Sequence, residues 1–334
     1  MTTELPRAVM LFSLDLELAW GTRGRPSAAA QGPSLDGARA AIEGLLSQFA
    51  MYQVPATWVV VGGLLMGRGD RQAHPWLDEP RFADIPRGCS RSQPRWYADD
   101  VLEAIQQCST PQEIGCHTLT HLYVDPSPAG REPFRQELQR FRELFDQLGW
   151  QQPTTFIYPK AMMGHFDVLA EAGFRCFRGP EPRWYENLPG VHASAALRML
   201  DGKLALRPNV GLPQKTAEGL WMLPSSQFYS PLRSVGKYVS VQQRVRKAIK
   251  GLRAAARGRR VFHLWTHPFN LGQRSDELLE GLERIFEEAC RLRDAGDLDL
   301  LSMGNLSRRL DDLPAAVPCP AVPNPPVSGP QTVS

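Results

Sequence analysis

The order of its apolar segments limits most strongly what this chain can fold into. Short apolar runs typical of strands alternate with longer segments whose apolar residues recur at helical spacing. We expect the first helix to begin at Ser34, a good N-cap residue. The expected strands are 8–14, 56–61, 113–116, 154–158, 174–177, 220–223, 261–266 and 298–302, and the expected helices are 35–49, 100–108, 131–148, 163–172, 241–256 and 276–295. Such alternation favours a parallel sheet or a barrel with helical connections.

Length and local composition divide the chain into a folded part and a tail. A chain of 334 residues is long enough to bury a full α/β core, and we expect residues 1–312 to form one catalytic domain. Long loops are expected at 67–99 and 179–218, where the sequence lacks periodicity. From 313 to 334 the chain holds seven prolines and no repeat of apolar positions, which predicts a disordered tail.

Charge and hydropathy argue against a nucleic-acid-binding protein and against a membrane-spanning protein. A net charge of +3, without a basic strip interleaved with aromatic residues, argues against binding to nucleic acid. The longest nearly uninterrupted apolar stretch, 54–66, is too short for a membrane span. The six cysteines are scattered without a C-x-x-C pair, and the first apolar run does not resemble a signal peptide, so we expect a cytoplasmic protein.

Two carboxylates follow the first expected strand, in the sequence Ser13-Leu14-Asp15-Leu16-Glu17. Side chains alternate along a strand, so Asp15 and Glu17 point to the same side. They also lie at the carboxyl end of the strand, where parallel sheets and barrels place their sites. The pair is either a metal-binding or catalytic group, or two solvated acids at a strand exit.

Two histidines follow the third expected strand. His117 and His121 are four residues apart, a spacing at which both rings can bind one metal ion. They can equally be capping or core histidines. Two histidines and one carboxylate would leave an open position on a metal ion, and this arrangement is typical of hydrolases.

A late strand and a middle strand also end in polar residues. His263, Trp265 and His267 share one side of the strand at 261–266, and Pro268 places His267 at its end. His267 can serve as a general acid because its pKa lies near neutral pH, or it can be structural. Lys160 follows the strand at 154–158, where it either pairs with Asp15 and keeps it ionised or lies on the surface.

These four elements, in this order, resemble the polysaccharide deacetylase family (carbohydrate esterase family four). Ser13-Leu14-Asp15-Leu16-Glu17 resembles the acidic motif of the family, and His117-Thr118-Leu119-Thr120-His121 matches its H-[ST]-x-x-H motif. Tyr158-Pro159-Lys160 resembles the third motif, and Trp265-Thr266-His267-Pro268 resembles the last. The resemblance spans about residues 7–310.

The resemblance implies an α/β fold, a distorted (β/α) barrel of about seven parallel strands. It implies that Glu17, His117 and His121 bind one divalent metal ion, usually zinc, and the same ligands also suit Fe(II), Co(II) or Ni(II). Many members have two adjacent aspartates, whereas here the second acid comes one residue later and is the longer Glu17.

The same resemblance assigns catalytic roles. Asp15 would be the general base and His267 the general acid, and a backbone N–H near Tyr158 would help to hold an oxyanion. Lys160 stands where members often use arginine to orient the base, and a lysine cannot form the bidentate pair that arginine forms. Trp265 and His263 would lie close enough to contact substrate.

The expected activity is removal of N-acetyl groups from a sugar, or from a polysaccharide or glycolipid intermediate, in the cytoplasm. Two alternatives stay open: hydrolysis of a small non-sugar amide or ureide, and a catalytically inactive barrel that binds sugar. Segment 244–260 contains eight lysines and arginines. It is either an ordinary surface helix or a peripheral contact with anionic membrane or a lipid-linked sugar.

Overall fold

The computed structural model describes residues 3–24, 31–66, 78–181 and 209–313. Its centre is strand β1 (Ala8–Leu16), of which all nine residues are buried. Strands β9 and β2 pair with it in parallel, and β10 pairs with its first half, Ala8 to Leu11. The run of apolar residues in β1 therefore reflects a strand that is covered on both faces.

The sheet is mostly parallel and curls without closing. Its order is β6-β7-β5-β4-β3-β2-β1-β9-β8, with β10 beside β1, and only β6 and β7 are antiparallel. Among the described residues no ladder joins β6 to β8, so the sheet is a half-barrel. The remaining strands are β2 (Thr57–Val60), β3 (Glu113–Cys116), β4 (Thr155–Phe156), β5 (Cys176–Arg178), β6 (Gln214–Lys215), β7 (Trp221–Leu223), β8 (Gln227–Phe228), β9 (Val261–Thr266) and β10 (Leu298–Leu301). The predicted α/β fold is confirmed, with the barrel open on one side.

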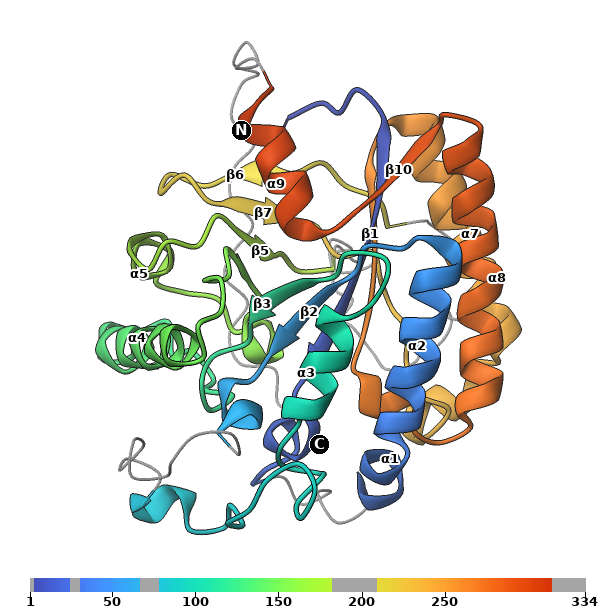
Figure 1. Ribbon diagram of the computed structural model, residues 1–334. Helices are drawn as coiled ribbons and strands as arrows, with labels where there is room; N and C mark the ends of the chain where they lie inside the picture. Colours follow the sequence, from blue (N-terminus) through green and yellow to red (C-terminus); the bar gives the residue numbers. More distant parts are fainter. Residues whose placement is uncertain (1–2, 25–30, 67–77, 182–208, 314–334) are drawn as a thin grey trace, which may run out of the picture.

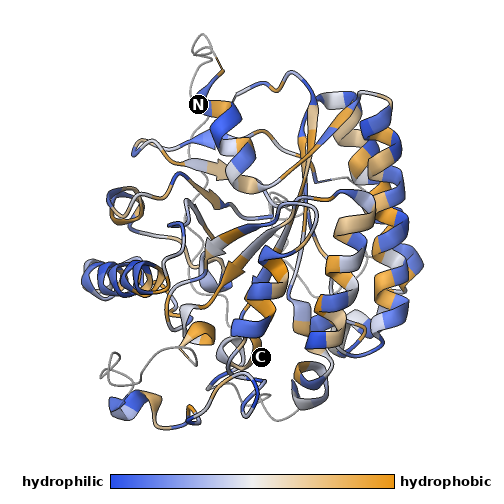
Figure 2. Ribbon diagram, viewed as in Figure 1, coloured by the Kyte–Doolittle hydropathy of each residue, from blue (hydrophilic) through white to orange (hydrophobic). Residues whose placement is uncertain are grey.

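Helices other than α9 cover the outer face of this sheet, and α2, α7 and α8 stand together on one side (Figure 1). Apolar and hydrophilic residues alternate along them, as expected of helices with one buried side (Figure 2). Edge-to-face ring contacts among Phe12 of β1, Phe49 of α2 and Phe286 of α8 fix this packing. The helices are α1 (Gly32–Asp36), α2 (Ala38–Tyr52), α3 (Asp99–Gln106), α4 (Arg131–Gln147), α5 (Phe166–Glu171), α7 (Val241–Gly258), α8 (Ser275–Asp294) and α9 (Met303–Asp311).

The prediction of Ser34 as an N-cap is wrong. Ser34 lies inside the short helix α1, which begins at Gly32 and ends before Gly37. A Cβ on Gly37 would overlap the backbone of Gly272, so the two segments approach too closely for any other residue. This backbone contact lies at the junction of α1 and α2, and a single sequence gives no sign of it.

Helix α9 is an element that the sequence pattern did not predict. Ser302 caps it by accepting a hydrogen bond from the backbone N–H of Asn305. Glu113 of β3 accepts a second one from the N–H of Gly304, at 2.9 Å. The buried residues Met303, Leu306 and Leu310 then pack on the face of the sheet that α2 and α8 leave uncovered. In Figure 1 the helix lies near the amino end of β1.

The described part of the first long loop is fixed by side chains. Arg95 forms an ion pair with Asp36, and the Tyr97 hydroxyl donates to the carbonyl of Pro86 at 2.7 Å. Trp96 packs edge-to-face against Trp20. Residues 67–77 of this loop, residues 182–208 of the second loop and the tail from residue 314 lie outside the described residues.

The basic segment 244–260 lies almost entirely on α7. Arg244 is not part of a solvated face, because it is buried and donates to Ser230 and to the carbonyls of Pro231 and Gly236. Arg253 pairs with Glu288 of α8. Contact of this helix with a membrane stays a prediction. No helix in the described ranges is long and apolar enough to cross a membrane.

Candidate metal and catalytic site

Asp15, near the carboxyl end of β1, and Glu17, directly after it, are almost completely buried. Glu17 stands directly before a short 3₁₀ turn, Leu18–Gly21, and its side chain folds back over that turn. A Cβ on Gly21 would overlap the carboxyl group of Glu17. The longer side chain of a glutamate therefore fits here because residue 21 is glycine.

The two histidines are presented by a tight turn after β3. The Nδ1–H of His117 donates to the carbonyl of Ile157 at 2.8 Å, because a carbonyl can only accept. This bond leaves Nε2 of His117 directed toward Glu17. Thr118 and His121 both have a left-handed backbone, with φ of 62°, which returns the second ring to the first.

Glu137 of α4 holds that turn in place. Its carboxylate accepts hydrogen bonds from the backbone N–H groups of Leu119 and Thr120, at 3.0 and 2.8 Å, and from the Thr120 hydroxyl at 2.7 Å. Burial raises the pKa of Glu137, although these donors oppose the shift. The strained backbone between the histidines is thus secured by an acid from a neighbouring helix.

Glu17, His117 and His121 converge into one group of possible metal ligands. One donor atom from each lies within 4.8 Å of the other two. Nε2 of His121 is 2.7 Å and Nε2 of His117 is 3.5 Å from the same carboxylate oxygen of Glu17. Within the described part of the chain, the buried Nε2 of His117 has no hydrogen-bond partner. Two nitrogens and one carboxylate, buried together, fit a divalent ion such as zinc.

The charge on Glu17 is stabilised by its neighbours. Burial alone would raise the pKa of Glu17, but His267 and His121 hold it well below its usual range. A carboxylate that stays ionised in a buried position is the form that binds a cation.

Asp15 forms a bidentate ion pair with Arg178, the last residue of β5. Both guanidinium–carboxylate distances are 2.7 Å, and the guanidinium also stacks over the ring of Trp265 at 4.1 Å. Burial opposes ionisation, but Arg178 lowers the pKa of Asp15 below its ordinary value. The prediction that Lys160 pairs with Asp15 is corrected here, because Arg178 occupies that position.

A buried network extends from Arg178 into the sheet. Arg178 donates to the Ser13 hydroxyl at 3.1 Å, and this hydroxyl lies 2.8 Å from Nε2 of His263. Burial and the nearby Arg178 lower the pKa of His263 to about 3, so its ring is neutral at neutral pH. Its neutral Nε2 accepts from Ser13, which makes His263 part of the support for Arg178.

His267 completes the group from the end of β9. Its Nε2 lies 3.8 Å from Asp15 and 3.6 Å from Glu17, and its Nδ1 lies 3.2 Å from the side-chain amide of Asn270. About 20% of its side chain is exposed, in contrast to the buried ligand group. The structure therefore places His267 where it can reach both the carboxylates and solvent.

The side chains of the third motif contact residues other than the three possible ligands. Lys160 is exposed, and its ammonium stands 4.2 Å from the centre of the Tyr123 ring. The Tyr158 side chain points into the core, where its hydroxyl donates to the carbonyl of Gly164 at 2.8 Å. The role predicted for a backbone N–H near Tyr158 stays a prediction.

Sequence reasoning missed two residues of this site, and each had a signal. Arg178 follows the expected strand 174–177 directly, so it is a strand-end charge like Asp15 and Lys160. Glu137 interrupts the apolar side of α4 between Phe134 and Phe141. A buried position for an acid on an apolar face indicates a specific partner.

Comparison with known proteins supports the fold. No family model and no curated protein matches the sequence. A structure from Mycobacterium smegmatis assigned as a polysaccharide deacetylase is 16% identical, with a TM-score of 0.63 over 96% of this chain and 98% of its own. A second structure with that assignment, from Pseudomonas aeruginosa PAO1, is 16% identical with a TM-score of 0.55, covering 90% and 89%.

A third solved structure, the Puue allantoinase, is 14% identical with a TM-score of 0.52, covering 90% of this chain and 89% of its own. At these identities the similarity establishes the fold, a polysaccharide-deacetylase-like half-barrel, and leaves function to be argued from the site.

Proposed function

We propose that this protein is a metal-dependent hydrolase that removes N-acetyl groups from a sugar or from a sugar-containing intermediate. One observation carries the proposal: Glu17, His117 and His121 converge, and Asp15 and His267 lie beside them at the same edge of the sheet. A metal site with a separate carboxylate and a separate histidine supplies the groups that amide hydrolysis requires.

A divalent ion held by Glu17, His117 and His121 would acidify a water molecule and polarise the amide carbonyl. Asp15 would accept a proton from the attacking water. Its two oxygens already accept from Arg178, which fixes the carboxylate plane and leaves lone pairs free to receive the proton. Its lowered pKa keeps it ionised and ready to act as the base.

His267 would protonate the departing amine, which is otherwise a poor leaving group. Its partly exposed ring lies within 4 Å of both carboxylates, and Asn270 contacts its other nitrogen. The Asn270 contact would orient the ring, so that Nε2 faces the reacting group.

A sugar amide is the preferred substrate because two of the structures that share this fold are assigned as polysaccharide deacetylases. The similarity to an allantoinase keeps a small amide or ureide as the second candidate. A cytoplasmic location and zinc as the physiological metal are part of the proposal.

Metal analysis tests the ligand group. The purified protein should bind about one equivalent of zinc, as three ligands for one ion require. His121→Asn should lose it, and His165→Asn should keep it. The two changes are matched, because both histidines have left-handed backbones that asparagine tolerates.

An activity screen on N-acetylated sugars tests the reaction. Wild type should release acetate, and Asp15→Asn should abolish release while retaining the metal. Release of ammonia from ureides without acetate release would favour the second candidate. Two results together would support an inactive sugar-binding barrel. The wild-type protein would bind no metal, and substitution of Asp15 would change none of the measured properties.

A further inference from the structure

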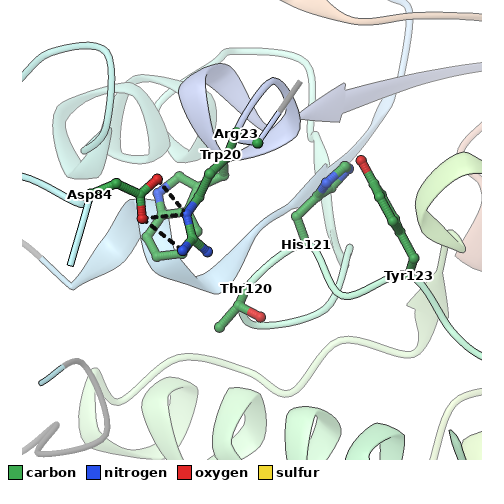
Figure 3. A pocket seen from close by; sticks show the side chains of 7 residues that line it. Trp20, Arg23, Asp84, Thr120, His121 and Tyr123 are labelled. Atoms are coloured by element: carbon green, nitrogen blue, oxygen red, sulfur yellow. Dashed lines mark hydrogen bonds and ion pairs between the residues drawn. The ribbon is translucent and has the colours of Figure 1, made fainter. Parts of the chain in front are cut away.

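A pocket of about 220 Å³ opens beside the metal ligand His121. The side chains of His121 and Tyr123 stand on one side of it, and Arg23 and Asp84 stand on the other (Figure 3). Trp20, Gly24 and Thr120 line the rest. Because His121 belongs to both, whatever occupies the pocket lies next to the proposed reaction centre.

The side chains that form the polar wall of this pocket are held in position by several contacts. Nε of Arg23 donates to both carboxylate oxygens of Asp84, at 2.9 and 2.8 Å. The guanidinium also lies over the ring of Phe82, with 5.2 Å to its centre. The loop that carries Asp84 is anchored in turn by the hydrogen bond from Tyr97 to Pro86. Asp84 is therefore held in position although half of its side chain is exposed.

The size and charge of the pocket select a ligand class. A volume near 220 Å³ is below the range of about 300 to 1,000 Å³ usual for drug-sized ligands, so the pocket suits one ring. The opposite charges of Arg23 and Asp84 compensate each other, so this wall is neutral. The wall still offers strong hydrogen-bond donors and acceptors, which suit a ligand with hydroxyl groups on adjacent ring atoms. The Trp20 and Tyr123 rings supply the apolar surface.

We propose that the Arg23–Asp84 pair binds ring hydroxyls of the substrate. This makes the pocket the subsite for one sugar residue, the residue that carries the scissile N-acetyl group. The inference deepens the proposed function and rests on it for the identity of the substrate. It adds two residues, both on the wall opposite His121 and Tyr123, that determine specificity without taking part in the chemistry.

Binding of free N-acetylhexosamines to the zinc-loaded protein, measured by calorimetry or NMR titration, tests the inference. All proteins compared in this titration, the otherwise wild-type one included, also carry Asp15→Asn, so that bound sugar is not hydrolysed. The probes are N-acetylglucosamine, N-acetylgalactosamine and N-acetylmannosamine. Asp84→Ala and Arg23→Gln are the test variants. Asp78→Ala is the matched control, since Asp78 lies in the same loop, is exposed and pairs with Arg87 at 3.5 Å, outside the pocket. Zinc content and melting temperature confirm that each variant is folded.

At least one of the three sugars should bind to wild type, and each test variant should raise its Kd about tenfold or more, as expected for a lost hydrogen bond to a charged group. The control should stay within about twofold of wild type, as expected for a surface pair. Equal binding by Asp84→Ala and wild type, or no binding of any probe to wild type, would overturn the inference.

The two proposals fail in different ways. If wild type releases acetate from a sugar but Asp84→Ala binds that sugar equally well, the deacetylase function stands and the subsite is wrong. If the sugar binds through Arg23 and Asp84 but no acetate is ever released, the subsite stands and the proposed reaction is wrong.

Discussion

At the scale of single residues, the pair formed by Asp15 and Arg178 is the contact on which the proposed mechanism depends most. Both groups are buried in the low-dielectric interior, where an unpaired charge is strongly destabilising. The guanidinium must therefore form hydrogen bonds to both oxygens of the carboxylate. Its planar, bidentate geometry also fixes the orientation of the proposed base.

Arg178→Lys should therefore reduce kcat by about 10- to 100-fold, because a lysine retains the charge but cannot hold both oxygens. Zinc content should be unchanged, since Arg178 does not contact the ligand group. Kinetics of acetate release and metal analysis on one preparation check both expectations.

Lys160→Met is the comparison for this variant. The ammonium of Lys160 lies over Tyr123 rather than beside Asp15, so its loss should change kcat by less than about threefold. A larger effect of Lys160→Met than of Arg178→Lys would contradict the assignment of Arg178 to Asp15.

Glu137→Ala should weaken zinc binding about 10- to 100-fold, the effect usual for residues that support metal ligands. The substitution removes three hydrogen bonds from the turn that presents His121. Competition with a zinc chelator measures the affinity, and Glu143→Ala, an exposed acid on the same helix, is the control. Unchanged zinc affinity in Glu137→Ala would show that the turn holds its shape without Glu137.

Much of the candidate site could be predicted from residue order, because Asp15, Glu17, His117 and His267 each come at or just after the end of a strand. The partner of Asp15 could not. Lys160 comes after a strand and Arg178 ends one, and the sequence alone does not decide which of the two reaches the proposed base. Lys160 and Ala161 both adopt left-handed backbones, which turn that segment sharply.

At the scale of elements, helices α7 and α8 are joined by the carboxylate of Glu288. It accepts from Arg253 of α7 and from Arg291 of its own helix, at 2.8 and 2.9 Å. Hydrogen bonds from Arg291 and from Arg253, together with the charges of the two arginines, outweigh burial and lower the pKa of Glu288 to about 2. The arginines are about half exposed, so solvent screens this gain.

Glu288→Gln should lower the free energy of unfolding by about 1 kcal/mol at pH 7, the upper range for surface ion pairs. The pKa is lowered in the folded state, so the stabilisation is complete above the ordinary value of 4.5 and disappears as the pH falls toward 2. Urea unfolding at pH 7 and pH 3 should show the difference between variant and wild type shrinking. Glu287→Gln, an exposed neighbour, should show no such pH dependence.

Elements with a strong pattern were predicted almost residue by residue, whereas short ones were not. Strands β3 and β9 begin and end as expected, and each is followed directly by a histidine, His117 or His267. Strand β8 has only two residues, which is too short for any periodicity. Helix α9 has no acid in its first turn, and Glu113 of β3 contacts its amino end instead.

At the scale of the whole molecule, α9 contributes buried surface that the sheet needs. Met303, Leu306 and Leu310 join Leu11 and Val59 in a second core, separate from the core beneath α2 and α8. Each fully buried side chain of this kind contributes about 1.5 to 3 kcal/mol. The folded unit therefore extends to the end of this helix.

A chain ending at Leu313 should keep the melting temperature of the full chain, and a chain ending at Ser302 should be unfolded or melt far lower. The first result would also support the prediction that residues 313–334 form a tail outside the domain. Calorimetry of both truncations, with a single cooperative transition for the longer one, is the measurement. A large loss of stability on removing the tail alone would contradict the predicted domain boundary.

Any side chain at position 21 would overlap Glu17, so the residues at positions 17 and 21 should covary. A larger residue at 21 can be accommodated only if the acid at 17 becomes shorter, and a shorter acid would no longer reach the histidines from the same backbone. Among related sequences, glycine at 21 should therefore accompany glutamate at 17. The pair offers a two-position criterion for finding chains that build the proposed metal site in this way.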